Sequence, residues 1–209
     1  MESPTSLTDS DALIVADAST VINLNASGHA REILQAIPNR FVVADAVPAE
    51  LEGGRRRGRR DADQLNELLA AGFVEIVRLG DVGAQQFEEL VVGRAALTLD
   101  DGEAATIAYA VEHQGIALID ERKANRICGE RYPDLRVGCT VDLFAHPAVQ
   151  RTLGKSTLAE SIVNALRDAR MRVLSRHMDW VVKLIGPNQA ALCNSLPRSA
   201  RISSISAPK

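Results

Sequence analysis

Short apolar runs alternate with helical patterns along most of this chain of 209 residues. Runs of this kind are typical of strands that are buried on both faces of a sheet. They occupy the ranges 13–16 (LIVA), 41–44 (FVVA) and 116–119 (IALI). Two further strands are predicted at 74–79 (VEIVRL), which alternates, and at 136–139 (RVGC). Because amphipathic helical patterns separate them, the sequence predicts an α/β fold: a parallel sheet of four or five strands between two layers of helices.

Four acidic residues stand where a strand ends or a helix begins. They are Asp17, Glu50, Glu103 and Asp120. In a parallel α/β sheet the ligand site lies beyond the carboxyl ends of the strands, so these side chains are expected at one edge. Carboxylates are costly to crowd together unless they bind a cation. An oxygen-only set without His or Cys favours Mg²⁺ or Mn²⁺ over zinc.

Three of these acids also have a purely structural interpretation. Asp100 and Glu103 fit a capping box, in which the two side chains satisfy amides at a helix start. Asp17 alone is typical of a turn or cap residue, and Glu50 alone of a solvated helix face. The structural interpretation weakens when all four acids recur in order at strand–helix junctions.

These residues lie in segments that resemble the PIN-domain family. The resemblance is closest to VapC-like ribonucleases of the branch with a GE-containing third motif. The similar segments are IVADASTVINL, VVADAVPAEL, LTLDDGEAATIAYA, ALIDERKANRI and RVGCTVDLF, which together span residues 13–144 in the family's order. The resemblance implies a PIN-like three-layer sandwich with extra C-terminal helices. It also implies a metal-dependent endoribonuclease, as in toxin–antitoxin pairs.

By this resemblance Asp17, Glu50, Glu103 and Asp120 are the catalytic, metal-binding acids. Ser19 is expected to hydrogen-bond to a ligand or to a water on the metal. Many family members have Thr-x-Asp or Thr-Asp-Asp after the last of these strands, whereas this chain has Ile-Asp-Glu, so either Asp120 or Glu121 is the fourth ligand. Asp120 is preferred because it follows the apolar run directly.

The stretch 53–60, GGRRRGRR, interrupts the helical pattern and concentrates positive charge. Five of its residues are predicted to grip RNA phosphates: Arg55, Arg56, Arg57, Arg59 and Arg60. The whole chain has a net charge of −3, so contact with nucleic acid must come from such a local group. A solvated loop, or a surface for an antitoxin or for DNA, are the alternatives. Because aromatic residues make up only 3% of the chain, base-stacking platforms are disfavoured.

The expected organisation is a disordered tail at 1–11, a nuclease domain at 12–150, a C-terminal helical extension at 151–187 and a flexible tail at 188–209. Two helical patterns within 156–186 predict a helical hairpin. No apolar run reaches membrane-spanning length, no secretory signal is evident, and the three scattered cysteines are typical of a reducing compartment. A cytoplasmic protein is therefore expected, and the resemblance implies a homodimer.

The sequence thus predicts a Mg²⁺- or Mn²⁺-dependent endoribonuclease that acts on RNA, with an antitoxin protein as a further partner. The alternative is a PIN module of weak activity that acts as a binding or regulatory partner. A phosphatase with an aspartyl nucleophile is disfavoured, because the segment after Asp17 lacks that signature's second Asp.

Overall fold

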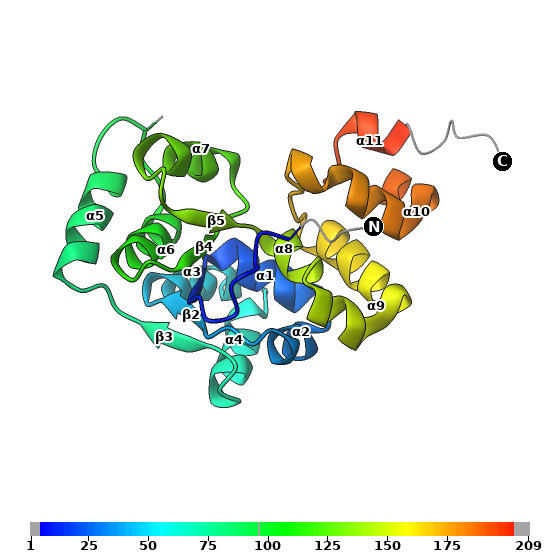
Figure 1. Cartoon of the computed structure of the whole chain (residues 1–209), viewed down its shortest axis with the longest axis horizontal. Coiled ribbons are helices and arrows are strands. Elements are labelled where there is room, and N and C mark those ends of the chain that lie inside the picture. Colours follow the sequence, from blue (N-terminus) through cyan, green and yellow to red (C-terminus); the bar gives the residue numbers. More distant parts are fainter. Residues whose placement is uncertain (1–4, 96, 203–209) are drawn as a thin grey trace. The chain divides into compact units, whose positions relative to one another are not determined.

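Five parallel strands form the predicted sheet. The structure is a computed structural model that describes residues 5–95 and 97–202. Along the sheet the strands follow the order β3-β2-β1-β4-β5. Figure 1 labels β2, β3, β4 and β5. Their bounds are Ile14–Ala16 (β1), Phe41–Ala44 (β2), Glu75–Val77 (β3), Ile116–Leu118 (β4) and Arg136–Gly138 (β5). The predicted α/β fold is therefore confirmed.

The chain divides into two compact units. The first, here called the sheet unit, comprises Thr8–Val21 and Pro38–Cys139. The second, the helical unit, comprises Met1–Leu7, Ile22–Ile37 and Thr140–Lys209. Helix α1 (Ala18–Ala26) begins in the sheet unit and ends in the helical unit.

Five helices belong to the sheet unit: α3 (Ala46–Arg55), α4 (Asp61–Ala70), α5 (Asp81–Val91), α6 (Asp101–Glu112) and α7 (Arg122–Arg131). Helix α6 is buried from Ala104 to Ala110 and packs against β1, β2 and β4. Four alanines in that stretch keep its surface thin, so the helix can lie close to the strands. The residues of β1, β2 and β4 are all buried, which matches their continuous apolar sequences.

Helix α3 extends further than its sequence pattern indicates. It runs through Gly53 and Gly54 and ends at Arg55, and a turn with Gly58 at φ +83° follows. Two helical glycines cost about 2 kcal/mol relative to alanine. Packing of α3 against α4 and α6 offsets that cost, because tertiary burial outweighs local propensity.

The helical unit contains α2 (Ala30–Ala36), α8 (Thr140–Phe144), α9 (Pro147–Asp168), a 3₁₀ turn η1 (Ser175–His177), α10 (Met178–Leu192) and α11 (Arg198–Ile202). Helices α9 and α10 pack together as the predicted hairpin. Helix α9 begins nine residues before the expected pattern and is kinked at Gly154, where φ is +69°. None of the helices in the described ranges is both long and apolar enough to cross a bilayer.

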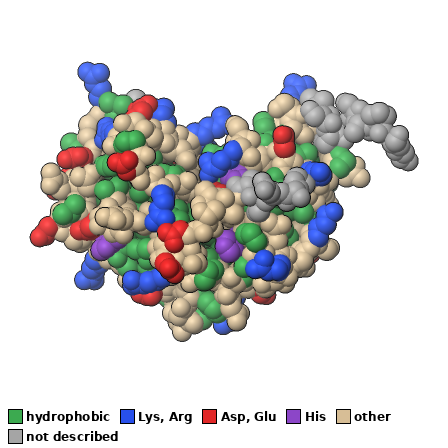
Figure 2. All heavy atoms as spheres, in the orientation of Figure 1, with side chains coloured by type: hydrophobic (Ala, Val, Ile, Leu, Met, Phe, Trp, Pro, Cys, Tyr) green, Lys and Arg blue, Asp and Glu red, His purple; other side chains and the backbone are tan. Residues whose placement is uncertain are grey.

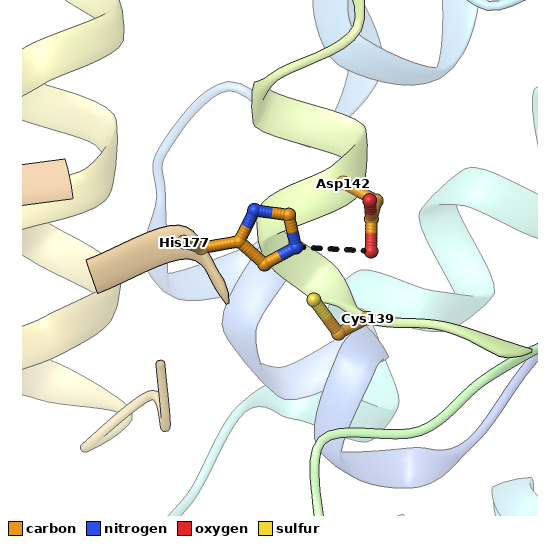
Figure 3. Close-up of side chains that lie close together, drawn as sticks. All are labelled: Cys139, Asp142 and His177. Atoms are coloured by element: carbon orange, nitrogen blue, oxygen red, sulfur yellow. Dashed lines mark ion pairs between the residues drawn. The ribbon is translucent and has the colours of Figure 1, made fainter. Parts of the chain in front are cut away.

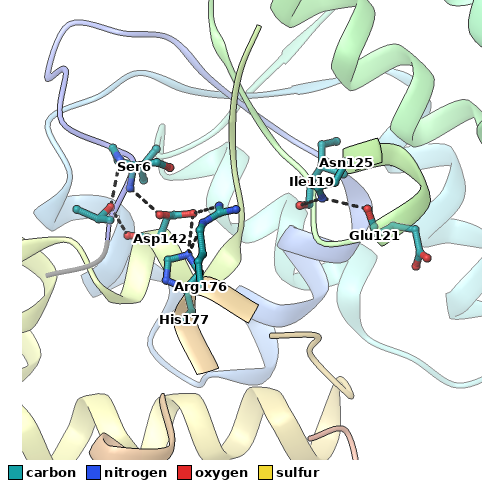
Figure 4. A network of polar contacts seen from close by, with 9 residues as sticks. Ser6, Ile119, Glu121, Asn125, Asp142, Arg176 and His177 are labelled. Carbon is teal, nitrogen blue, oxygen red and sulfur yellow. Dashed lines mark hydrogen bonds and ion pairs between the residues drawn. The ribbon is translucent and has the colours of Figure 1, made fainter. Parts of the chain in front are cut away.

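Parts of the two predicted tails are ordered in the structure. Helix α10 continues past 188 to Leu192, and Leu196 beyond it is buried. At the other end Leu7 is buried and the Ser6 amide donates a 2.6 Å hydrogen bond to Asp142 Oδ1 (Figure 4). The remaining tail residues, 1–4 and 203–209, lie outside the described residues.

Candidate metal centre at the carboxyl edge of the sheet

Asp17 follows β1 directly and is held by the first turn of α1. The residue is 2% exposed. Its Oδ1 accepts a 2.7 Å hydrogen bond from the Thr20 amide, and its Oδ2 accepts a 2.7 Å bond from Ser19 Oγ. The expected contact of Ser19 with this acid is therefore present. Both oxygens are fixed in place before any cation binds, as a ligand of a preorganised site requires.

The amino end of α6 lies at the same edge of the sheet. At the other end of this helix Gly115 leads into β4, where the Ile116 amide donates to the Leu13 carbonyl just before β1. Since β1 and β4 are parallel, α6 must start at their carboxyl ends. Asp100 caps the helix, and its Oδ1 accepts a 3.0 Å hydrogen bond from the Glu103 amide. The predicted cap is confirmed, and Glu103 stands in the first turn.

Glu50 reaches this edge from α3. Its carboxylate lies against the Cα of Gly102, where a Cβ atom on residue 102 would collide with Glu50 Oε2. Gly102 is buried in the first turn of α6, one residue before Glu103. Gly102 therefore leaves room for the Glu50 carboxylate, and Glu103, the next residue, adds a second carboxylate at the same place.

The pKa values of these carboxyl groups show that they form one electrostatic cluster. The pKa of Glu103 is raised to about 8, first by burial and then by the negative charges of Asp100, Asp17, Glu121 and Glu50. The pKa of Glu50 is raised to about 7, again by burial first and then by Asp100, Asp17 and Asp101. Burial also raises the pKa of Asp17, against the hydrogen bonds from Thr20 and Ser19.

Asp120 and Glu121 occupy the turn between β4 and α7. Asp120 is 3% exposed, and Glu121 is the half-buried residue that precedes α7. Asn125 Nδ2 clamps this turn by donating to the carbonyls of Ile119 (2.8 Å) and Glu121 (3.0 Å) (Figure 4). The charge of Glu121 acts on Glu103, so this residue belongs to the surroundings of the cluster.

Two features of the cluster go beyond the sequence-based prediction. Asp100, like Asp101, was a further candidate for the site but was interpreted as the helix cap, yet among the charged neighbours it has the largest effect on the pKa values of Glu50 and Glu103. The doubled acid at 100–101 was the available signal. Asn125 fixes the turn at Asp120 through its amide, and no sequence motif marked it.

The five arginines of the 53–60 stretch are all exposed. Arg55 pairs with Glu52 (3.2 Å) and Asp63 (3.3 Å), and Arg59 pairs with Asp61 (3.1 Å). The two Arg55 pairs are exposed and contribute roughly 0–1 kcal/mol each, so Arg55 can exchange partners at little cost. In the part of the chain that the structure describes, Arg56, Arg57 and Arg60 show no ion pair within 4.0 Å.

A further buried acid, Asp142, belongs to the helical unit and has a different role. His177 Nε2 lies 3.3 Å from Asp142 Oδ2 (Figure 3). Arg176 donates to both groups, at 2.9 Å to Asp142 Oδ2 and at 3.0 Å to His177 Nε2. A guanidinium on both groups already neutralises the carboxylate and disfavours a cation there. Cys139, also drawn in Figure 3, belongs to the sheet unit.

The close approach at Gly102 leads to a testable prediction. In Gly102→Ala the new Cβ should displace the Glu50 carboxylate and weaken divalent-ion binding by about tenfold or more. The fold itself should survive, because alanine is favoured over glycine in a helix by roughly 0.5–1 kcal/mol. Calorimetric ion titration and a thermal melt measure the two effects.

Gly53→Ala is the matched control, because it adds the same methyl group to α3 at a place where nothing lies within 4 Å. It should raise the melting temperature without changing ion affinity. If Gly102→Ala bound the ion as tightly as wild type does, the assigned role of Glu50 would be wrong.

A family model for the PIN domain matches residues 13–187, which is most of the chain. The protein therefore belongs to the PIN-domain family, whose members are generally nucleases. Searches of curated proteins and of solved structures found no significant match.

Proposed function

We propose that the protein is a Mg²⁺- or Mn²⁺-dependent endoribonuclease whose metal centre is formed by Asp17, Glu50, Glu103 and Asp120. The observation that carries this proposal is the placement of Glu50 against Gly102, next to Glu103, where burial and nearby negative charges raise the pKa values of Glu50 and Glu103 to about 7 and about 8. Carboxyl groups that repel one another at a fixed site are a cost to the fold. A divalent cation between them would remove that cost and return the groups to their charged form.

The residues present fit a hard cation. The cluster offers carboxylate oxygens, which suit Mg²⁺ or Mn²⁺ better than softer metals. When bound, such an ion supplies Lewis-acid chemistry, since it lowers the pKa of water and offsets the charge of a phosphate. The chain's own contribution is to orient ligands: Ser19 and Thr20 fix Asp17, Gly102 admits Glu50, and the Asn125 clamp shapes the turn that carries Asp120.

The exposed arginines supply the complementary charge for an anionic substrate. Arg55, at the end of α3, lies five residues beyond Glu50, or about 7.5 Å along the helix axis. Acidic and basic side chains are interspersed on the face shown in Figure 2, so a local group of arginines is needed to attract RNA. We assign phosphate contacts to Arg55, Arg56, Arg57, Arg59 and Arg60.

The proposal also includes the cellular role, the location and the partners of the protein. A small PIN ribonuclease of this kind fits the toxin of a toxin–antitoxin pair, acting in the cytoplasm as a homodimer that an antitoxin protein holds in check. Fluorescent titration of a candidate antitoxin, together with a measured solution mass, tests these points separately from catalysis.

The direct test of catalysis is cleavage of a mixed pool of structured and single-stranded RNA. Wild type should cut with Mg²⁺ or Mn²⁺ and stop when EDTA is added. Glu103→Gln should cut at least about 100-fold more slowly, because it removes a charged oxygen from the centre. Glu67→Gln, an exposed acid on α4, is the control and should cut at the wild-type rate. Cutting that persisted at full rate in Glu103→Gln would contradict the proposal.

A further inference from the structure

The C-terminal part of the helical unit, residues 140–209, carries a surplus of positive charge that the net charge of the chain conceals. Residues 140–209 contain ten Lys and Arg against four Asp and Glu, a surplus of six. Residues 1–139 contain 14 basic and 23 acidic residues, a deficit of nine. A basic segment within an acidic chain is typical of a surface that meets a polyanion.

Part of this charge lines a pocket at the carboxyl end of α9. The pocket has a volume of about 460 Å³ and is lined by Leu166, Arg167, Arg170, Leu192, Asn194 and Ser195. In the described ranges neither Arg167 nor Arg170 makes an ion pair within 4.0 Å, and both are exposed. Asp168 is the one acid among residues 165–172, a stretch that also holds Arg172.

The polar groups of the pocket are arranged as donors. Arg201 Nη1 donates to Asn194 Oδ1 at 3.1 Å, which leaves the Asn194 amide hydrogens to donate elsewhere. Ser195 Oγ donates to the Leu166 carbonyl at 2.8 Å and so satisfies one of the free acceptors at the helix end. Two arginines and the Asn194 amide thus line the pocket, and their N–H donors suit a phosphate.

The backbone of Arg170 gives an independent reason to assign its side chain a function. Arg170 follows the end of α9 in the left-handed region, with φ +56°. Glycine is the least strained residue at such a position, and a non-glycine residue there is uncommon. The chain therefore keeps a strained arginine where glycine would hold the same turn, which points to a role for the guanidinium.

We propose that this pocket, formed by Arg167, Arg170, Asn194 and Ser195, binds a backbone phosphate of an RNA strand. The proposal rests on the ribonuclease function and adds a second RNA-binding element to it. The lining contains no aromatic side chain on which a base could stack. The pocket therefore holds the strand with little preference for base sequence.

The test measures RNA binding without cleavage. The full chain carries Glu103→Gln, EDTA is present, and the anisotropy of a labelled oligouridine is followed over a salt series. Replacing Arg167→Gln together with Arg170→Gly should lower affinity at least about tenfold and reduce the salt slope by about 1.4, or about 0.7 for each lost contact. Oligoadenosine should give the same losses.

The control pair Arg151→Gln and Lys183→Gln removes the same charge from exposed positions of α9 and α10, outside the pocket. An equal loss in both pairs would mean that overall charge binds RNA, and would overturn the proposal. Arg170→Gly alone should melt no lower than its parent, because the turn favours glycine. If that variant unfolds, Arg170→Lys and Arg167→Gln carry the test.

A third probe separates RNA from an acidic protein partner. If the pocket variants lost affinity for poly-L-glutamate but kept their affinity for RNA, the pocket would belong to a protein interface and the proposal would be wrong. If the pocket does not bind RNA, the acid centre should still cleave RNA. If the protein does not cleave RNA, oligouridine binding and its dependence on Arg167 and Arg170 can still be measured in the same way.

Discussion

Asp17→Asn should slow metal-dependent RNA cleavage by at least about 100-fold. Asp17 is rigidly held, with both oxygens hydrogen-bonded within the first turn of α1. An asparagine can still accept from the Thr20 amide through Oδ1, so the turn should persist. It replaces the other oxygen by a donor, which cannot ligate a cation. Rates from single-turnover cleavage of the RNA pool measure the effect.

Asp45→Asn is the matched control for this experiment. Asp45 also follows a strand at the carboxyl edge, directly after β2, but it is exposed and makes no side-chain cap bond. Its replacement should leave the rate within about twofold of wild type. Circular dichroism and the melting temperature establish that both variants are folded. Equal rates for Asp17→Asn and Asp45→Asn would remove Asp17 from the proposed centre.

The metal-free protein should lose stability as the pH rises from about 5 to about 8. The pKa values of Glu50 and Glu103 are raised in the folded chain from 4.5 to about 7 and about 8. Between those limits the folded state holds more protons than the unfolded state does, so the free energy of unfolding falls with pH. Burial of the Glu50 carboxyl group is only partial and the residue as a whole is exposed, so solvent screens its share. The expected loss in the free energy of unfolding is about 2 kcal/mol in total.

Divalent ions should reverse this loss. Urea unfolding at pH 5 and at pH 8, with EDTA or with Mg²⁺, measures the four free energies. Stabilisation by Mg²⁺ should be larger at pH 8, where protons compete less for the carboxylates. Glu103→Gln should be more stable than wild type at pH 8 in EDTA and should gain less from Mg²⁺, whereas Glu67→Gln should match wild type. A pH-independent stability in EDTA would contradict the clustering of charge.

The fold was predictable because its signals are local. The runs LIVA, FVVA and IALI are continuous apolar stretches, and a central parallel strand has no solvent face to break the pattern. The cap at Asp100 was equally local, since the bond from the Glu103 amide spans three residues. The placement of Asp17 at the carboxyl edge of the sheet was predictable from strand direction alone.

Other features depend on contacts that a local pattern cannot contain. The extension of α3 through Gly53 and Gly54 runs against helix propensity and depends on packing against α4 and α6. The role of Gly102 appears only when Glu50, fifty-two residues earlier, is placed against it. Asp142 in the VDLF segment is tied to Ser6 and Arg176, at 136 and 34 residues' separation, which no spacing rule indicates.

The central claim is that the acids at the carboxyl edge hold a divalent cation, and calorimetric titration of the purified chain with Mn²⁺ near pH 7.5 tests it most directly. Repeating the titration in two buffers of different ionisation enthalpy counts the protons released. The account predicts saturable binding with net proton release, because Glu103 is partly protonated when the site is empty. It predicts loss of both signals in Glu50→Gln combined with Glu103→Gln. Binding that is absent in wild type, or unchanged in that double variant, would contradict the account.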